Sequence, residues 1–481
     1  MKVAFIYFDF MTGAGGKYYE GIASLSAVLK AAGHQTALFH VTTRPDVEDL
    51  VGRFERDYGD ADIAAFSATS NVFPYIAVTS ARLKERIPRL VTICGGPHPT
   101  LCPDEAIAAS GLDVICVGEG EYSLRELCDC LETGRDIPTI SGLWVKRDGH
   151  ILRGQSRPWI RNLDELPLPD RELFDYRNSV DREMGRLTFM GSRGCPFNCT
   201  HCCNHAFKTL CSDGTPYVRF KSVDRLLEEI RAARSRYPEA EKIHFLDDIL
   251  TLKPSWFRSF TAQYKEQIGL PYVCNSRFDL LDDELMEMLQ KSGCAWLLLG
   301  LESGDQEIRR DILKRDQSDE QILRLTELGR GKGIRFSLYN MVGIPGETLK
   351  RARKTVKLNA RLRPDACQLS IYYPYVKTEL YALCKEHGYL TGKTLDSYFE
   401  AETTLKLPEF PRSQILFAYR NFYDFLDYYK TVLRFGGWKR RFLEGLVDFL
   451  WMHPRIYATA NPGYRALKKA YKKVRRRRVK S

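Results

Sequence analysis

Four cysteines and two histidines lie within the fifteen residues GSRGCPFNCTHCCNH, positions 191–205. Three of these cysteines, Cys195, Cys199 and Cys202, have the spacing C-x3-C-x2-C, so their thiolates can reach one metal centre from a single loop. A 4Fe–4S cluster held by three thiolates keeps one iron open, and an open iron can bind substrate. The spacing therefore favours an iron–sulfur cluster at these three residues.

Zinc is the main alternative metal for this loop. A structural zinc site needs four closed ligands, commonly from two C-x2-C pairs that lie far apart in the chain. Cys203, His205 or Cys211 can supply a fourth ligand, but the sequence has no second C-x2-C pair. Zinc and a cysteine-rich loop without metal both stay open at this point.

The elements upstream of the loop alternate between short apolar runs and helical patterns over residues 1–137. The runs are KVAFIYF, TALFHV, IAAFSA, VTICGG and VICVGE. Continuous apolar strands that alternate with helices predict an α/β domain with a doubly wound, Rossmann-like parallel sheet. Ligands of such sheets bind at the carboxyl ends of the strands, here the loops SATSN, GGPHPT and GEGEY. None of these loops carries the G-x-G-x-x-G fingerprint, so a dinucleotide is not favoured.

A second alternation of strands and helices begins after residues 138–184, which we expect to form an irregular connector packed against both neighbours. The six expected strands between 185 and 395 are LTFMGS, KIHFLD, YVCNSR, WLLLGLE, RFSLYNMVGI and CQLSIYY. Six βα units predict a partial, TIM-like (β/α)6 barrel, short of the eight units that close a full one. Residues 396–460 predict a helical region, and 461–481 form a basic tail.

The cysteine motif and five later segments resemble, in order, the motifs of radical S-adenosylmethionine (SAM) enzymes. CPFNCTHC resembles their C-x3-C-x-φ-C signature, and HFLDDIL, NSRFDL, LGLESG and MVGIPGET resemble the motifs of the second to fifth strands. YYPYVKTELY resembles the closing motif P-G-T-x-L-Y. Upstream, GGPHPT and GEGE resemble the cobalamin-binding domain of one large subclass, the class B methyltransferase-like enzymes. The resemblance covers roughly residues 1–390.

The resemblance implies a 4Fe–4S cluster on the three cysteines, with SAM bound to the open iron and cleaved to a 5′-deoxyadenosyl radical. It implies SAM contacts from the cysteine loop 191–205 and from the later strand ends. These residues are His201, Asp247, Asp248, Arg277, Glu302, Gly343, Ile344 and Pro345. Two departures stand out: His201 occupies the usual aromatic position φ, and Val376-Lys377 replaces the usual Pro-Gly.

Cobalamin is the further cofactor that the resemblance implies for residues 1–137. The residues expected to line it are Ser67, Thr69, Ser70, Gly95, Gly96, His98, Gly118, Glu119 and Gly120. The motif D-x-H-x-x-G, which supplies a histidine to cobalt in many such domains, is absent, and His34 and His98 have other contexts. The resemblance therefore implies cobalamin without a histidine ligand, or a domain that has lost the cofactor.

The remaining thiols and histidines of interest are expected to have no metal. We expect Cys203 not to be a ligand, because the family motif ends at Cys202. His205 is expected at the surface. The other cysteines considered are expected to be small core residues: Cys211, Cys274, Cys294 and Cys367.

The number of cysteines and the distribution of charge indicate the compartment of the protein and the surfaces that it can bind. Fourteen cysteines and no secretory leader pattern in MKVAFIYFDF predict a cytosolic protein. The net charge is +11, and residues 461–481 alone carry ten Lys and Arg and no acid. Together with the amphipathic stretch 438–457, this tail favours the anionic cytoplasmic face of a membrane over nucleic acid. A solvated tail is the plain alternative.

We interpret the chain as a radical SAM enzyme that methylates an unactivated carbon with cobalamin. Its partners would be a small-molecule or lipid-linked substrate and an electron donor such as flavodoxin or ferredoxin. A radical cyclase, oxidase or rearrangement catalyst without methyl transfer is the second interpretation. A zinc-stabilised module that binds membrane or nucleic acid is the third.

Overall fold

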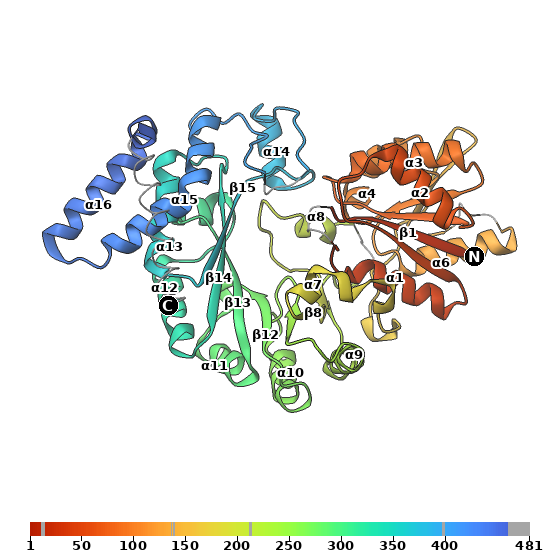
Figure 1. Cartoon of the computed structure of the whole chain (residues 1–481), viewed down its shortest axis with the longest axis horizontal. Helices are drawn as coiled ribbons and strands as arrows, with labels where there is room; N and C mark the ends of the chain where they lie inside the picture. Colours follow the sequence, from red (N-terminus) through yellow and green to blue (C-terminus); the bar gives the residue numbers. More distant parts are fainter. Residues whose placement is uncertain (11–14, 136, 138–139, 211–213, 397–399, 460–481) are drawn as a thin grey trace, which may run out of the picture.

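The computed structural model describes residues 1–10, 15–135, 137, 140–210, 214–396 and 400–459. An N-terminal sheet domain lies at one end, a half-open barrel lies in the middle, and two long helices, α15 and α16, lie at the far end (Figure 1). The expected Cys211 and the basic tail 461–481 fall outside the described residues.

The N-terminal sheet has, in the described part of the chain, the strand order β2-β1-β3-β4-β5-β6-β7. Strands β1 to β5 pair in parallel, as the apolar runs predicted. The order 2-1-3-4-5 places the topological switch point between β1 and β3, where ligands of such sheets bind. The strands are β1 Lys2–Phe8, β2 Gln35–Val41, β3 Ile63–Ser67, β4 Val91–Gly95 and β5 Val114–Cys116.

Helices cover both faces of this sheet, which explains why β1, β3 and β4 are buried almost throughout. The first helix ends where the sequence predicted, because Gly33 adopts a left-handed φ of 87° directly after it. The helices are α1 Glu20–Ala31, α2 Val47–Tyr58, α3 Phe73–Arg86, α4 Pro97–Leu101, α5 Pro103–Ala108 and α6 Glu121–Thr133.

The connector is less irregular than the sequence predicted. Its first part forms β6 (Leu143–Arg147) and β7 (His150–Arg153), which extend the N-terminal sheet in antiparallel fashion. A polar Asp-Gly turn joins them, and the strands are only five and four residues long, which is too short for a clear periodic pattern. The rest is loop with short helical turns and α7 (Val180–Glu183).

The barrel has six parallel strands in the order β15-β14-β13-β12-β11-β8, and no pairing among the described residues joins β8 to β15. This confirms the partial (β/α)6 barrel. The strands are β8 Arg186–Phe189, β11 Lys242–Phe245, β12 Tyr272–Ser276, β13 Cys294–Glu302, β14 Arg335–Val342 and β15 Ala366–Ile371. The intervening helices are α9 Val223–Arg236, α10 Pro254–Gln267, α11 Asp283–Ser292, α12 Asp319–Gly331 and α13 Leu349–Leu362.

Side-chain caps fix the start of most barrel helices. The side chains of Ser222, Asp282, Ser318 and Thr348 each accept a hydrogen bond from the backbone N–H three residues on. Such caps satisfy backbone donors that have no partner within the helix. Each helix therefore starts at a defined distance from the strand end before it.

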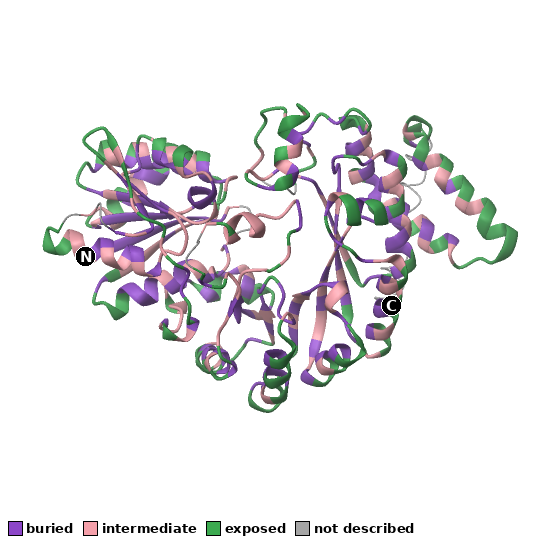
Figure 2. Ribbon diagram, turned by 180° about the vertical axis from the view of Figure 1, so that it is seen from behind, coloured by how far each residue is buried: buried purple, intermediate pink, exposed green. Residues whose placement is uncertain are grey.

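The barrel strands alternate between buried and half-buried side chains, unlike the N-terminal strands (Figure 2). On β14, Phe336, Leu338 and Asn340 are buried, whereas Tyr339 and Met341 are half-buried. The buried set packs against the outer helices, so the half-buried set faces the barrel interior. The interior is therefore partly open and can take a bound group.

After the last barrel strand the chain forms α14 (Glu379–Glu386), which lies within the segment predicted as barrel. It then forms α15 (Arg412–Val432) and α16 (Gly437–Met452), which lie in the segment 396–460 predicted to be helical. Helix α15 packs on α13 and β15 and continues the hydrophobic core of the barrel. Among the described helices, none is long and apolar enough to cross a bilayer.

Candidate functional site

The cysteine loop follows β8 and the two-residue strand β9 (Ser192–Arg193) and ends at α8 (Asn204–Lys208). Thr200 anchors it to the barrel: its hydroxyl donates to the Ile312 carbonyl over 2.6 Å, and its own carbonyl accepts from the Leu380 N–H over 2.9 Å. Cys199 is buried, and Cys195 and Cys202 are half-buried. The loop thus lies at the carboxyl end of the barrel strands, where catalytic groups of barrels lie.

Hydrogen bonds from cationic and polar groups reach the sulfur atoms of the loop. Arg277 donates to Cys199 Sγ over 3.1 Å, and Arg315 approaches the same sulfur at 3.6 Å. Asn204 donates to Cys202 Sγ over 3.5 Å. Donation from the Cys203 thiol, helped by Asn204, lowers the pKa of Cys202 to about 6. These donors stabilise thiolates, which are the form that binds metal.

The thiols of the loop are not gathered as closely as a compact zinc site requires. Tetrahedral zinc with Zn–S bonds of about 2.3 Å holds its sulfurs about 3.8 Å apart. Among the described residues, the only three or more ligand atoms within 4.8 Å of one another belong to His98, Cys102 and Glu105.

Of the two expected aspartates, only Asp248 is available to a ligand. Asp247 is fully buried and accepts from the Gly191 N–H over 3.0 Å and from the Ser192 hydroxyl. Burial raises the pKa of Asp247 to about 6. Asp248 is exposed and accepts one hydrogen bond, from Asn204 over 3.2 Å. Asp247 therefore holds the start of the cysteine loop, and Asp248 offers a carboxylate beside it.

Arg277, Arg315 and Glu302 form a charged group next to Cys199. Arg277 is held by Asp279 over 2.7 Å and lies 3.7 Å above the Phe197 ring, and Arg315 donates to the Gly300 carbonyl over 2.8 Å. Burial raises the pKa of Glu302, although both arginines oppose the rise. Glu302 has a φ of 62°, in the left-handed region, at a register shift between β13 and β14. Backbone strain of this kind in a non-glycine residue is common at functional sites.

The expected adenine-side loop, Gly343-Ile344-Pro345, is organised by a buried carboxylate that sequence reasoning missed. Glu347 Oε2 accepts from the N–H groups of Gly343 and Ile344 over 2.7 and 3.3 Å. Gly343 has a φ of 82°, and a Cβ there would lie 3.2 Å from Ile415. The Glu in GIPGET thus fixes a backbone shape that only glycine adopts easily.

Glu347 predicts a pH dependence of stability. Burial raises the pKa of Glu347 to about 8 from the ordinary 4.5, so the folded state favours the protonated form. Its contribution to stability is therefore complete below about pH 4.5 and is lost as the pH rises to about 8, at up to about 1.4 kcal/mol per pH unit. In Glu347→Gln we expect the unfolding midpoint to fall less steeply between these pH values. The exposed Glu379→Gln is the control, and equal slopes for wild type and E347Q would refute the assignment.

The two histidines of the loop lie partly inside the molecule. His201 Nδ1 and His205 Nδ1 are buried and have no hydrogen-bond partner among the described residues. Burial, with Arg315 and Arg277 nearby, lowers the pKa of His201 to about 3. The prediction of a surface position for His205 is wrong: it is half-buried and lines a cavity of about 460 Å³ together with Trp144.

The same cavity reaches the closing motif. Lys377, which stands where the family has glycine, lines this cavity and has a left-handed φ of 64°. The loop thus keeps the backbone conformation suited to glycine although the glycine is absent.

A second, more apolar cavity of about 440 Å³ lies at the switch point of the N-terminal sheet. Of the residues expected to line cobalamin, six do line it: Ser67, Gly95, Gly96, Gly118, Glu119 and Gly120. A Cβ on Gly96 would lie 3.0 Å from backbone atoms of Ala68, so glycine is required for the close approach of the two loops. Met190, Arg193 and Leu246 of the barrel line the same cavity. A group bound here would therefore face the barrel.

Thr69, Ser70 and His98 are not among the residues that line this cavity. The His98 ring is buried, stacks on Phe73 at 4.0 Å and makes a 3.2 Å hydrogen bond with Ser70 Oγ. The GGPHPT segment turns into α4 directly after Gly96, which carries His98 away from the strand ends.

Glu119 lines the cavity, but both of its carboxylate oxygens already form ion pairs. Arg193 and Arg219, which face each other across β9 and β10 (Arg219–Phe220), each donate to a Glu119 oxygen over 2.8 Å. Arg193 also donates to Glu121 over 2.6 Å. The GEGE loop of the sheet domain is thereby tied to the strand that leads into the cysteine loop. The sequence signal was the arginine two residues before Cys195, which motif reasoning did not use.

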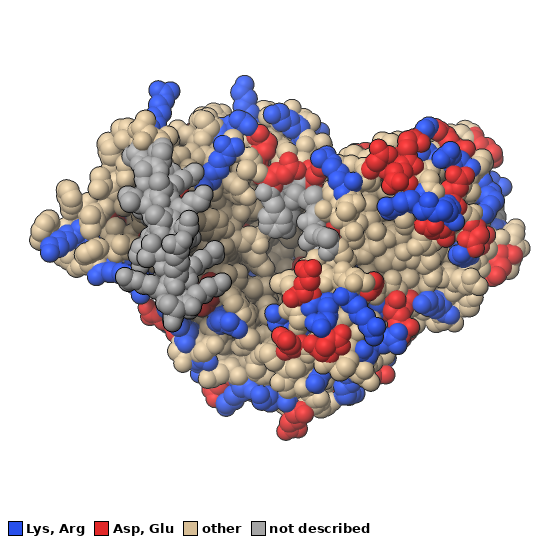
Figure 3. Space-filling view, viewed as in Figure 1, with Lys and Arg blue, Asp and Glu red and all other residues tan. Residues whose placement is uncertain are grey.

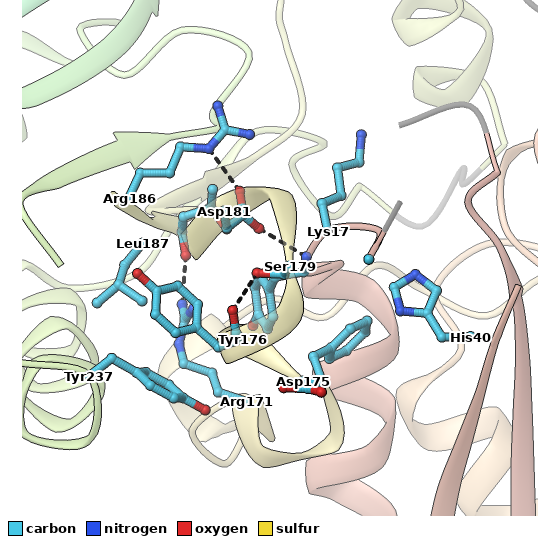
Figure 4. A pocket seen from close by; sticks show the side chains of 14 residues that line it. Lys17, His40, Arg171, Asp175, Tyr176, Ser179, Asp181, Arg186, Leu187 and Tyr237 are labelled. Atoms are coloured by element: carbon cyan, nitrogen blue, oxygen red, sulfur yellow. Dashed lines mark hydrogen bonds and ion pairs between the residues drawn. The ribbon is translucent and has the colours of Figure 1, made fainter. Parts of the chain in front are cut away.

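A small pocket beside the connector offers no comparable site (Figure 4). Asp181, its central carboxylate, accepts from Arg186 over 2.7 Å and from the Tyr18 N–H over 3.0 Å. Arg171 donates to the Thr188 carbonyl and to Glu229. These groups join α1, the connector and β8 and leave little room for a ligand.

Comparison with known families adds two matches. Residues 190–358 match the Radical SAM superfamily, and residues 18–128 match the B12 binding domain. An uncharacterised methyltransferase of Pyrococcus horikoshii is 27% identical over 78% of this chain and 79% of its own length. An anaerobic magnesium-protoporphyrin IX monomethyl ester cyclase of Rubrivivax gelatinosus is 26% identical over 79% of this chain and 69% of its own length. A hopanoid C-3 methylase of Methylococcus capsulatus is 26% identical over 75% and 67%.

Two solved structures share the arrangement of domains. The cobalamin-dependent SAM radical enzyme OxsB, with aqua-cobalamin and SAM bound, aligns with a TM-score of 0.67 at 14% identity over 94% of this chain and 75% of its own. The radical SAM methyltransferase TsrM of Kitasatospora setae, with cobalamin and a [4Fe-4S] cluster bound, aligns with a TM-score of 0.64 at 15% identity over 82% and 76%. At these identities the likeness establishes the fold alone.

Proposed function

The chain is a radical SAM enzyme with an N-terminal B12-binding domain, and we propose that it methylates an unactivated carbon atom. One observation carries this proposal: the switch-point cavity is lined both by the glycine loops of the sheet domain and by Met190, Arg193 and Leu246 of the barrel. A methyl carrier bound in it would contact residues of the barrel as well as those of the sheet domain.

Cys195, Cys199 and Cys202 would hold the 4Fe–4S cluster. When bound, the cluster supplies the electron that cleaves SAM, and cobalamin carries the methyl group. The protein itself would supply charged side chains next to the cluster and would fix the position of its ligands. Arg277 and Arg315 direct N–H groups at the sulfur of Cys199 in a buried site, and these contacts would influence how readily an electron enters a cluster held there.

The remaining side chains would bind SAM. Asp248 would accept from an ammonium group beside the loop, and Glu302 would meet further polar groups of SAM. Gly343, Ile344 and Pro345 present backbone, with Glu347 holding its shape. His201 borders this site. In this proposal Asp247 positions the loop and does not touch SAM.

Labelled SAM tests the methyl transfer. Enzyme reconstituted anaerobically with iron, sulfide and cobalamin is incubated with methyl-labelled SAM and a one-electron reductant. We expect label to appear in the bound cobalamin, and Cys203→Ala to behave like wild type. Cleavage of SAM with cobalamin retained and no label moved would contradict methyl transfer and favour the cyclase, oxidase or rearrangement interpretation.

The proposed partners follow from the same chemistry. A flavodoxin or ferredoxin would deliver the electron, and the substrate would be a small or lipid-linked molecule. The relatives' names include a porphyrin cyclase and a hopanoid methylase, so similarity does not select a substrate. We also propose that the enzyme works in the cytoplasm at an anionic membrane face, which the basic segment 461–481 favours.

A further inference from the structure

Helix α16 has one side packed on the body of the protein. Val447 and Trp451 are buried on this side, and the Trp451 indole N–H donates to the Leu349 carbonyl over 2.8 Å. The helix packs on α13 and α15. It lies at the end of the molecule farthest from the N-terminal domain (Figure 1).

The other side of α16 exposes large apolar side chains. Trp438 is 73% exposed, Phe442 66%, Leu446 48% and Phe449 46%. Spacings of four, four and three residues place all four on one face of the helix. Met452 and Ile456 continue this face beyond them. A contiguous apolar strip in water marks an interaction surface.

The charges of α16 are sorted between the two sides. Its two acids face the body: Glu444 pairs with Lys357, and Asp448 accepts from Tyr429 over 2.6 Å and pairs with Lys357 over 3.3 Å. Basic residues are exposed beside the apolar strip at Lys439 and Arg441, whereas Arg440 lies on the other side and pairs with Glu444 over 3.9 Å. Figure 3 shows mostly uncharged surface with blue Lys and Arg side chains at this end of the molecule. The outward side thus combines apolar and positive groups with no described acid.

We propose that the outward face of α16 inserts into the surface of an anionic lipid bilayer. Apolar side chains bordered by cations match a bilayer in which lipid tails lie below acidic headgroups. An acidic soluble protein would match the cations but not the apolar side chains. The segment 461–481, with its ten basic residues, follows the same end of the chain and adds a second electrostatic attraction. The further step, that the substrate is held in the membrane, rests on the proposed methyl transfer.

Vesicle flotation of the full-length holoenzyme tests the contact. Vesicles of phosphatidylcholine with about one third phosphatidylglycerol are compared with vesicles of phosphatidylcholine alone, since about this much anionic lipid gives a strong surface potential. We expect the wild type to float with the anionic vesicles. The double variant Trp438→Ser/Phe442→Ser should bind at least about tenfold more weakly, because two large apolar groups no longer enter the bilayer. The matched control is Val78→Ser/Met184→Ser, which removes exposed apolar side chains elsewhere and should bind as wild type.

The other outcomes overturn the proposal. Equal flotation of the wild type and the α16 variant would exclude insertion of this face. A concentration-dependent dimer in sedimentation that the α16 variant abolishes, without vesicle binding by the wild type, would assign the face to a second copy of the chain. Flotation does not require SAM cleavage, so a failure of the membrane contact is separable from a failure of the proposed chemistry.

Discussion

Replacing Cys199 by alanine removes the bound iron and lowers SAM cleavage by at least about a thousandfold, on the expectation that three thiolates act as one unit. Wild-type protein reconstituted anaerobically should hold about four irons per chain and the variant close to none. Iron and acid-labile sulfide analysis gives the first result, and 5′-deoxyadenosine formation gives the second.

The fold should survive this change, because the partners of Cys199 have other contacts. Arg277 keeps its pair with Asp279, and Arg315 keeps the Gly300 carbonyl. The neighbouring Cys203→Ala is the matched control and should retain its iron. If Cys199→Ala kept the full iron content, or Cys203→Ala lost it, the assignment of ligands would be wrong. Zinc in place of iron would exclude the enzyme interpretation.

Replacing Arg193 by alanine is expected to produce the second large effect, on stability and on cobalamin binding. Among the described residues, the change leaves the buried Glu121 with only the Ser24 hydroxyl, at 2.9 Å, as a side-chain hydrogen-bond donor. Removing one partner of a buried pair costs about 3–5 kcal/mol, since the remaining charge stays away from water. The unfolding midpoint should fall accordingly. Cobalamin affinity should fall at least about tenfold, because the GEGE loop lines the cavity.

Two further variants separate the ion pair from a general loss of packing. Arg310→Ala breaks the exposed pair with Asp311 and should cost less than about 1 kcal/mol. Adding Glu121→Gln to Arg193→Ala should restore part of the stability, because the unpaired charge is removed. An unfolding midpoint equal to that of the wild type in Arg193→Ala would refute the proposed tie between the two domains.

Apolar periodicity predicted both sheets because it depends on local pattern. All five N-terminal runs and all six barrel runs are strands in the structure. β6 and β7 were missed because they are only five and four residues long, and β7, at the edge of the sheet, is mostly exposed and has no buried face.

The residues of the candidate site were predictable where a motif fixes the residue type. They were less predictable where the direction of a side chain decides whether it reaches the site. The motif HFLDDIL could not show that Asp247 turns inward to Ser192, whereas Asp248 stays exposed with one hydrogen bond from Asn204. Nor could GGPHPT show that His98 leaves the cavity with α4. Three residues were missed: Arg315, Asn204 and Glu347. Arg315 and Asn204 contact a cysteine sulfur, and Glu347 accepts from backbone N–H groups. No fixed sequence spacing marks such contacts.

The alternation on the barrel strands has a consequence for divergence. Stability depends on the side chains that face the outer helices, such as Phe336 and Leu338 of β14, whereas Tyr339 and Met341 face the interior and are only half-buried. Substitutions at interior positions therefore change the shape of the chamber at little cost in packing free energy. Relatives about 26% identical can then keep one scaffold while their names record substrates as different as a porphyrin ester and a hopanoid. New specificity in this barrel can accumulate on one side of each strand while selection preserves the other.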